Sequence, residues 1–297
     1  MQVLEKLNVK INLTEKVNKF GVIILKVNPM KNSFNGKILG RSLSDWVAFA
    51  CDKLPIKFVE FDGKENILNI ARNNLNDNVD YSIILLSTTP LIENGVIKEI
   101  IDYCSYKQVN LCKLPVGYVV NNQYLMDTDN PSVDSLFSQH LDNFYVVENK
   151  KQYAYALSVL QNKINSFHIE NGVDIIDPQS VYIEPEVDID KGVEIYSRNT
   201  LKGQTKITSG VILKENNVIE NSKLGKNSCI SGSVINGSIV GANVYISSFC
   251  EINNGLIDDD CTISSGCKIN NYRLEKNSKV KANTVLGDED DSNRGTR

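Results

Sequence analysis

The chain has 297 residues, of which 41% are hydrophobic and 23% charged, and its formal net charge at pH 7 is −4. This composition is typical of a globular protein, and the mildly acidic balance gives no electrostatic reason to expect nucleic acid or an anionic membrane as a partner. No apolar run approaches the roughly eighteen residues of a membrane span. The N-terminus lacks a basic stretch followed by an apolar core, so we also expect no secretory signal.

The first part of the chain, residues 20–125, alternates strand-like and helix-like stretches. Short apolar runs predict strands at residues 21–25, 57–61 and 81–86. Apolar residues at helical spacing predict helices at residues 43–54 and 93–104. Strands separated by helices predict an α/β sheet with short right-handed crossovers, in a domain that we place at residues 1–147.

A long connecting helix is predicted next, over residues 148–172. Its apolar residues recur at helical spacing from Tyr153 to Phe167. Asn171-Gly172 is a common signal for the C-terminus of a helix. His168 lies near this end, and we expect it to have a solvated or capping role rather than a catalytic one.

In the last part of the chain, residues 183–286, an aliphatic residue returns every six positions, with occasional steps of five. A helix would repeat apolar residues every three or four positions, and a half-exposed strand every two. A period of six is typical of a parallel β-helix, in which each short strand pairs with the coils above and below. We therefore predict a β-helix of about six coils at residues 173–287. The charged segment 288–297 lacks apolar anchors, so a disordered tail is predicted there.

The seven cysteines form no CxxC pair. Cys250, Cys261 and Cys267 each lie four residues after an aliphatic residue of the repeat, where small residues face a narrow interior. We interpret them as buried reduced thiols rather than metal ligands or disulfide partners. Reduced thiols lead us to expect a cytoplasmic location.

Two segments resemble a known family. Residues 171–183, which end the helix and open the coils, and residues 201–205 are similar to the bifunctional N-acetylglucosamine-1-phosphate uridyltransferase/glucosamine-1-phosphate acetyltransferase family. The similarity is specific over residues 148–225 and weaker elsewhere. It implies a shortened, nucleotidyltransferase-like α/β domain with a Rossmann-type sheet, joined by the helix to a left-handed parallel β-helix of hexapeptide repeats. It also implies a homotrimer.

Nucleotidyl transfer in that family needs a glycine-rich loop and cations for the triphosphate, and a carboxylate that holds Mg²⁺. Here residues 26–30 lack the loop's glycines and arginine, and the family's metal-binding aspartate falls on Thr88. Lys37 matches the family's phosphate-contacting lysine, and Glu148 falls on its second metal ligand. We therefore predict Lys37 and Glu148 as weak nucleotide-binding candidates, with Mg²⁺ only if a nucleotide binds. No resident metal and no catalytic residue are predicted, and pairing of Lys37 with a surface carboxylate is the alternative.

Acetyl transfer to an amine needs a general base, and the sugar phosphate needs cations. The family's arginine falls on Asn253, its paired lysines on Asn270 and Asn271, its histidine base on Ala282 and its tyrosine on Val285. The chain also ends before the family's last coils, which form the acetyl-coenzyme A groove. The resemblance therefore implies a relative without either family activity.

Two other hypotheses stay open. One is an active nucleotidyl- or acyltransferase that acts on a sugar phosphate through a remodelled site. The other is a purely structural oligomer. The expected partners are a nucleotide or sugar nucleotide and two further copies of the chain, with no nucleic acid and no membrane.

Overall fold

The computed structural model describes residues 18–27 and 36–287, and the chain divides into two compact units. The first, the α/β unit, contains Met1–Lys31 and Leu43–Val147. The second, the β-helix unit, contains Asn32–Ser42 and Glu148–Arg297. The predicted tail at residues 288–297, and residues 28–30 of the segment after the first strand, lie outside the described residues.

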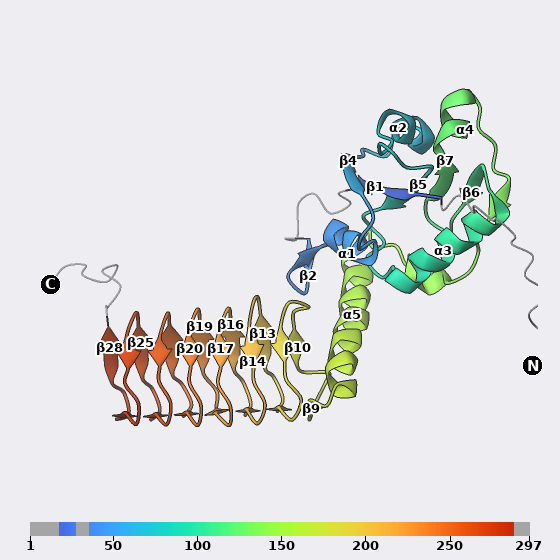
Figure 1. The fold of residues 1–297 in the computed structure, drawn as a ribbon. Coiled ribbons are helices and arrows are strands. Elements are labelled where there is room, and N and C mark those ends of the chain that lie inside the picture. The colour runs from blue at the N-terminus through green and yellow to red at the C-terminus, as the bar shows by residue number, and fades with distance from the viewer. Residues whose placement is uncertain (1–17, 28–35, 288–297) are drawn as a thin grey trace, which may run out of the picture. The chain divides into compact units, whose positions relative to one another are not determined.

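The α/β unit is built around a six-stranded sheet in the order β4-β1-β5-β7-β6-β8 (Figure 1). Its strands are β1 (Phe20–Lys26), β4 (Ile56–Glu60), β5 (Tyr81–Leu86), β6 (Leu111–Lys113), β7 (Tyr118–Asn121) and β8 (Ser135–Leu136). β1 pairs in parallel with β4 and β5, whereas β7 runs antiparallel to β5 and β6. The sheet is therefore mixed, and its parallel half contains the three strands predicted from the sequence.

Helices cover both faces of this sheet. They are α1 (Leu43–Ala50), α2 (Ile67–Asn73), α3 (Asn94–Lys107) and α4 (Asn122–Asp127), with a short 3₁₀ helix η1 at Leu141–Phe144. Val22 and Ile24 of β1 belong to a buried cluster with residues of α1 and α3. Ile23 and Leu25 belong to a second cluster with residues of α2 and α4. Because β1 is buried on both faces, its sequence is an unbroken apolar run rather than an alternating one.

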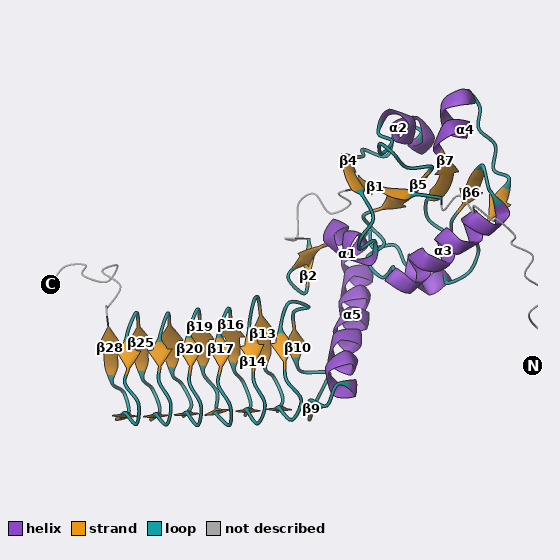
Figure 2. Cartoon of the chain, in the orientation of Figure 1, coloured by secondary structure: helices purple, strands orange, loops and turns teal. Residues whose placement is uncertain are grey.

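Three parallel sheets run along the β-helix, and each is named after its first strand (Figure 2). The β9 face contains β9 (Asp174–Ile175), β12 (Glu194–Ile195), β15 (Ile212–Leu213), β18 (Cys229–Ile230), β21 (Tyr245–Ile246), β24 (Thr262–Ile263) and β27 (Lys279–Val280). The β10 face contains β10 (Tyr182–Ile183), β13 (Thr200–Lys202), β16 (Val218–Glu220), β19 (Val234–Asn236), β22 (Glu251–Asn253), β25 (Lys268–Asn270) and β28 (Val285–Gly287). The β11 face contains β11 (Asp188–Ile189), β14 (Lys206–Ile207), β17 (Lys223–Leu224), β20 (Ile239–Val240), β23 (Leu256–Ile257) and β26 (Arg273–Leu274).

The β-helix has about seven coils, since two of its faces contain seven strands each. The prediction of about six coils was too low for two reasons. The first coil begins at Ile175, ahead of the regular series, and steps of five residues shorten the later coils. The predicted fold class, an α/β domain followed by a parallel β-helix of hexapeptide repeats, is confirmed.

Small polar side chains line the interior corners of the coils and bond to the next coil. The Ser233 hydroxyl donates to the carbonyl oxygen of Ser247 at 2.9 Å. In the following coil the Cys250 thiol donates to the carbonyl oxygen of Ser264 at 3.2 Å. The prediction for Cys250, Cys261 and Cys267 is confirmed, because all three are buried and free.

The outer corners of the coils need a left-handed backbone. Asn221, for example, has a φ of 48° in the coil after Gly203, and a Cβ at Gly203 would lie 2.2 Å from its amide oxygen. Glycine and asparagine fill most of these corners because they adopt positive φ with little strain. The exceptions with larger side chains among the described coils are Arg198 and Phe249.

Helix α5 (Lys150–Glu170) covers the start of the β-helix. The Gln161 amide donates to the carbonyl oxygens of Gln179 and Val181 at 3.1 and 3.0 Å. The Asn165 amide, which is buried, donates to Pro178 and Val181 at 2.7 and 3.0 Å. The amides thereby satisfy carbonyl groups that a preceding coil would otherwise bond.

His168, near the end of α5, is buried, so of the two expected roles, solvated or capping, the solvated one is wrong. Its burial is consistent with the packing of α5 against β9 and β10. Burial lowers the pKa of His168, and the nearby Asp188 carboxylate partly opposes this effect.

In the part of the chain that the structure describes, no helix is long and apolar enough to cross a membrane.

Candidate functional site

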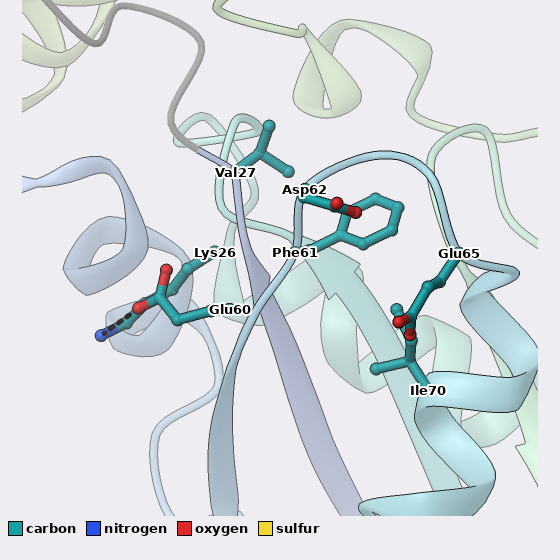
Figure 3. A pocket seen from close by; sticks show the side chains of 7 residues that line it. All are labelled: Lys26, Val27, Glu60, Phe61, Asp62, Glu65 and Ile70. Atoms are coloured by element: carbon teal, nitrogen blue, oxygen red, sulfur yellow. Dashed lines mark ion pairs between the residues drawn. The ribbon is translucent and has the colours of Figure 1, made fainter.

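An open cavity of about 500 Å³ lies at the carboxyl ends of β1 and β4 in the α/β unit (Figure 3). Ligands of parallel α/β sheets bind at this edge, and the volume lies in the range of small-molecule sites. The apolar lining includes Phe61 and Ile70, and the charged lining consists of Lys26, Glu60, Asp62 and Glu65. In the sequence the only signal for this site is Asp62-Gly63, which directly follows a predicted strand.

The charges of this cavity are unfavourable for a polyphosphate. The Lys26 ammonium lies 3.8 Å from the Glu60 carboxylate and 5.0 Å from the centre of the Phe58 ring. Asp62 accepts a hydrogen bond from the backbone of Lys64 at 3.0 Å. With the lysine paired, the Asp62 and Glu65 carboxylates give the lining a negative balance.

At the carboxyl end of β5, next to that of β1, the Ser87 side chain forms hydrogen bonds with the backbone of Val27. The backbone N–H of Val27 donates to the Ser87 hydroxyl at 3.0 Å, and that hydroxyl donates back to the carbonyl oxygen of Val27 at 3.3 Å. Thr88 is only 2% exposed, and its carbonyl oxygen accepts from the backbone of Val147 at 2.7 Å. The position that the resemblance assigns to a metal-binding aspartate therefore has a buried, neutral side chain.

The two predicted nucleotide-binding residues, Lys37 and Glu148, belong to the β-helix unit, whereas the cavity belongs to the α/β unit. Both side chains are exposed. The carbonyl oxygen of Lys37 accepts a hydrogen bond from the Tyr153 hydroxyl of α5, and the backbone of Glu148 donates to the Gln152 side chain at 2.9 Å. Within the described ranges, neither charged group forms an ion pair.

Lys37 is part of a hairpin, β2 (Lys37–Ile38) and β3 (Arg41–Ser42), that packs on the first coils. The Arg41 guanidinium lies 2.7 Å from the Glu186 carboxylate. At Gly40 the φ is 79°, and a Cβ there would approach the Glu184 carboxylate to 2.8 Å. Burial, with a smaller contribution from Glu184, raises the pKa of Tyr182 in the first coil to about 12. These contacts hold the backbone of Lys37 in place.

The β-helix positions that correspond to the acetyltransferase site carry neutral amides. The Asn253 amide donates to Asn270 at 3.1 Å, and the Asn254 amide donates to Asn271 at 3.2 Å. Asn253 also donates to the Glu251 carboxylate at 3.2 Å. We call these four asparagines the amide ladder. Ala282 and Val285 are exposed and carry no group that titrates. Among the described residues, no group of three or more His, Cys, Asp or Glu side chains is arranged to hold a metal ion.

The hexapeptide coils match a known family of sequences. Residues 206–296 match the family described as GlmU-like, C-terminal hexapeptide. The C-terminal coils are GlmU-like. The bifunctional protein GlmU of Clostridium beijerinckii is 39% identical over 106 residues, which cover 36% of this chain and 23% of that protein. GlmU of Clostridium novyi is 28% identical over 186 residues, which cover 54% of this chain and 41% of that protein. The match therefore spans less than half the length of either GlmU protein, and the resemblance predicted from the sequence is confirmed.

Solved structures give weaker likenesses than the GlmU sequences do. PerB of Caulobacter crescentus, in complex with CoA and GDP-perosamine, gives a TM-score of 0.32 at 10% identity, covering 90% of this chain and 94% of that chain. The UDP-N-acetylglucosamine acyltransferase of Francisella novicida gives 0.22 at 16% identity, covering 39% and 59%. Rv0371c of Mycobacterium tuberculosis gives 0.31 at 12% identity, covering 47% and 98%. At such low TM-scores these proteins tell nothing about the function of the present chain.

Proposed function

We propose that this protein is a GlmU-like scaffold that catalyses neither nucleotidyl transfer nor acetyl transfer and that weakly binds a nucleotide or sugar nucleotide. The observation that carries this proposal is the amide ladder. Its side chains hydrogen-bond to one another at 3.1 and 3.2 Å in place of the family's arginine and lysines. Neutral amides that are already paired offer little binding energy to a sugar phosphate.

The absence of a base supports the same proposal. An amine attacks a thioester only as the free base, so acetyl transfer needs a group that takes its proton. The resemblance assigns this group to Ala282, which has no titratable side chain. Both histidines of the chain, His140 and His168, lie outside the coils.

The α/β unit gives a parallel argument against nucleotidyl transfer. In-line displacement on a triphosphate depends on neutralising its negative charge, chiefly with Mg²⁺. The buried hydroxyl of Thr88 replaces the carboxylate that would hold this ion. The cavity beside it presents Asp62 and Glu65, which repel phosphate groups.

Weak nucleotide binding is proposed at Lys37 and Glu148. Lys37 offers an exposed ammonium on a hairpin whose backbone is fixed by Tyr153. Glu148 lies two residues before the start of α5, and it would reach a phosphate group only through Mg²⁺. Mg²⁺ therefore enters this proposal only with the nucleotide.

We also propose that the protein forms a homotrimer in the cytoplasm. The flat faces of a triangular β-helix can pack around a threefold axis, as the resemblance implies. The seven cysteines, all of them free thiols, support a reducing compartment.

A second candidate is an active transferase with a remodelled site. The cavity of about 500 Å³ at the carboxyl ends of β1 and β4 favours it, because ligands bind at this edge in α/β sheets. In that case the substrate would be a sugar phosphate or a related compound that tolerates the acidic lining.

Calorimetry and a turnover assay with the full chain separate these candidates. UTP, UDP-N-acetylglucosamine and acetyl-coenzyme A are each titrated with Mg²⁺ present, and products from UTP or acetyl-coenzyme A with sugar phosphates are measured by chromatography. The proposal expects weak uridine nucleotide binding and no product. Lys37→Ala should abolish the binding heat, whereas Lys64→Ala, an exposed lysine of the α/β unit, should leave it unchanged. Product formation would establish the second candidate, and no binding at all would leave a purely structural oligomer.

A further inference from the structure

We propose that Cys104 and Cys112 form a site of reversible oxidation, at which a hydroperoxide converts the two thiols into a disulfide between α3 and β6. We call these two residues the thiol pair. Both belong to the α/β unit, so the inference does not depend on the nucleotide binding proposed for the β-helix unit. In a reducing compartment such disulfides are transient and form in response to an oxidant. Three features of the described residues support the inference.

The first feature is the contact between the two thiols. Cys104 lies in the last turn of α3 and Cys112 in the middle of β6, and both side chains are fully buried in one hydrophobic cluster. The backbone turns sharply between them, since Gln108 has a φ of 50° and its N–H donates to the carbonyl oxygen of Cys104. The two thiols hydrogen-bond to each other. Thiols in contact meet the first geometric requirement for a disulfide.

The second feature is the contrast with the other cysteines. Cys250, Cys261 and Cys267 each donate to a backbone carbonyl oxygen of the next coil, at 3.2, 3.2 and 3.1 Å. Their thiols therefore serve as structural donors. Cys51 is buried in the same cluster as the thiol pair, and burial raises the pKa of its thiol to about 12. Of the seven cysteines, all of which the structure describes, only the thiol pair bonds thiol to thiol.

The third feature is a difference in acidity between the two thiols. The hydrogen bond from Cys104 lowers the pKa of Cys112, and burial opposes this effect. The backbone N–H of Phe137 and the Lys107 ammonium also lower this pKa, whereas the Asp134 carboxylate raises it. The same thiol–thiol bond, together with burial, raises the pKa of Cys104. Cys112 is therefore the thiol that attacks an oxidant, and Cys104 is the neighbour that resolves the product.

A hydroperoxide reaches this site at the edge of the sheet. β6 lies next to β8, an edge strand of two residues, and Cys112 pairs there with Ser135. The side chain of Leu136 in β8 is 60% exposed. Short edge elements with few buried contacts open locally far more often than the whole domain unfolds. Hydrogen peroxide, which is little larger than water, enters during such openings.

The proposed reaction is a two-electron oxidation. The Cys112 thiolate attacks one oxygen of the hydroperoxide, the O–O bond breaks, and the other oxygen leaves with a proton as water or an alcohol. Cys112 is then a sulfenic acid. The Cys104 sulfur attacks it, the S–S bond forms, and the S–O bond breaks as the oxygen leaves as water with the proton of Cys104. Two thiols are thus oxidised and one hydroperoxide is reduced, and a thiol reductant reverses the change by exchange.

The test treats the folded full chain with hydrogen peroxide, unfolds it in N-ethylmaleimide to block the remaining thiols, and digests it with trypsin without reduction. Cleavage after Lys98, Lys107 and Lys113 places the two cysteines in separate peptides, residues 99–107 and 108–113. Mass spectrometry should find these peptides joined, at the sum of their masses less two hydrogen atoms. Dithiothreitol should separate them.

Two serine variants test the roles of the thiols. In Cys104→Ser the resolving thiol is missing, so Cys112 should accumulate as a sulfenic acid that dimedone traps. In Cys112→Ser the attacking thiol is missing, so Cys104 should stay unmodified. Cys51→Ser is the matched control, because Cys51 is another buried cysteine of the α/β unit. Its loss should leave the joined peptides unchanged.

The wild type decides the inference, so the result does not depend on the folding of any variant. Joined peptides that dithiothreitol separates support the inference. Peptides that stay unjoined in the treated wild type, or a Cys112 recovered there as sulfinic acid, overturn it and leave the thiol pair as core packing. Dimedone on Cys104 in Cys112→Ser, with none on Cys112 in Cys104→Ser, overturns the assigned order of attack. None of these results bears on the proposed function, since no nucleotide is present.

Discussion

The hydroxyl of Tyr153, in helix α5, donates a hydrogen bond to the backbone carbonyl oxygen of Lys37, 116 residues earlier in the chain. This bond ties the β2–β3 hairpin to the helix, and burial of the phenol raises the pKa of Tyr153. The candidate ligand lysine is thus positioned by its backbone, while its ammonium is left exposed.

Tyr153→Phe should therefore loosen the hairpin without changing its charge. Removing one such hydrogen bond costs about 1 kcal/mol, and the loss should appear locally, because the Arg41–Glu186 pair remains. We expect faster amide hydrogen exchange at residues 37–42 and weaker nucleotide binding. Tyr106→Phe, at an exposed tyrosine, is the control. Unchanged exchange in the hairpin would show that Tyr153 does not hold it.

Thr88→Asp restores the residue type that the resemblance assigns to a metal site, yet we expect it to destabilise the protein rather than to create activity. Thr88 is 2% exposed, and an unpaired buried carboxylate should lower the free energy of unfolding by at least about 2 kcal/mol. Thr88→Val, which is similar in shape, should lose much less. Urea unfolding with and without Mg²⁺ measures both effects. Stabilisation of Thr88→Asp by Mg²⁺ would contradict this account, because it would reveal a usable cation site.

Cys250 occupies the corner that Ser233 fills one coil earlier, and its thiol donates to the carbonyl oxygen of Ser264. Cys250→Ser keeps a donor and should change the free energy of unfolding by less than about 1 kcal/mol. Cys250→Val keeps the bulk, removes the donor and should lower stability by about 1–3 kcal/mol, because a buried carbonyl oxygen loses its partner. The reverse order in urea unfolding would mean that packing outweighs hydrogen bonding at this corner.

His168 should make stability depend on pH. Its pKa is lowered in the folded protein, mainly by burial, so the folded state favours the neutral ring. As pH falls below about 6.5, the unfolded chain takes up the proton first, and the free energy of unfolding decreases until the lowered folded pKa is passed. His168→Gln should flatten this decrease between pH 7 and pH 5 in urea unfolding. Parallel curves for the two proteins would exclude His168 as its source.

The hexapeptide coils and the strands with long apolar runs could be predicted from the sequence, because each gives a local pattern. The β-helix follows from the spacing of residues such as Ile219 and Ile235, because the register of each coil is set by the coil before it. Strands β1 and β5 were predicted because burial on both faces makes them unbroken apolar runs. The short strands β6 and β8 lack such a signal, and they were missed.

The candidate site was harder to predict because it depends on contacts that are distant in the chain. No local pattern indicates that Arg41 meets Glu186 or that Lys37 lies in the unit of the β-helix. The acidic cavity arises where the ends of β1 and β4 come together, and this pairing brings Lys26 beside Glu60. The sequence did indicate the replacement of the family's aspartate by Thr88, although not that this threonine is buried.

The amides of Gln161 and Asn165 occupy carbonyl oxygens of Pro178, Gln179 and Val181 at the start of the β-helix. Exposed strand edges invite pairing with other chains and so promote fibre growth. With these three acceptors already taken, a foreign strand approaching from the helix side finds fewer groups to bond there. Two amide side chains thereby protect one end of the stack from runaway polymerisation.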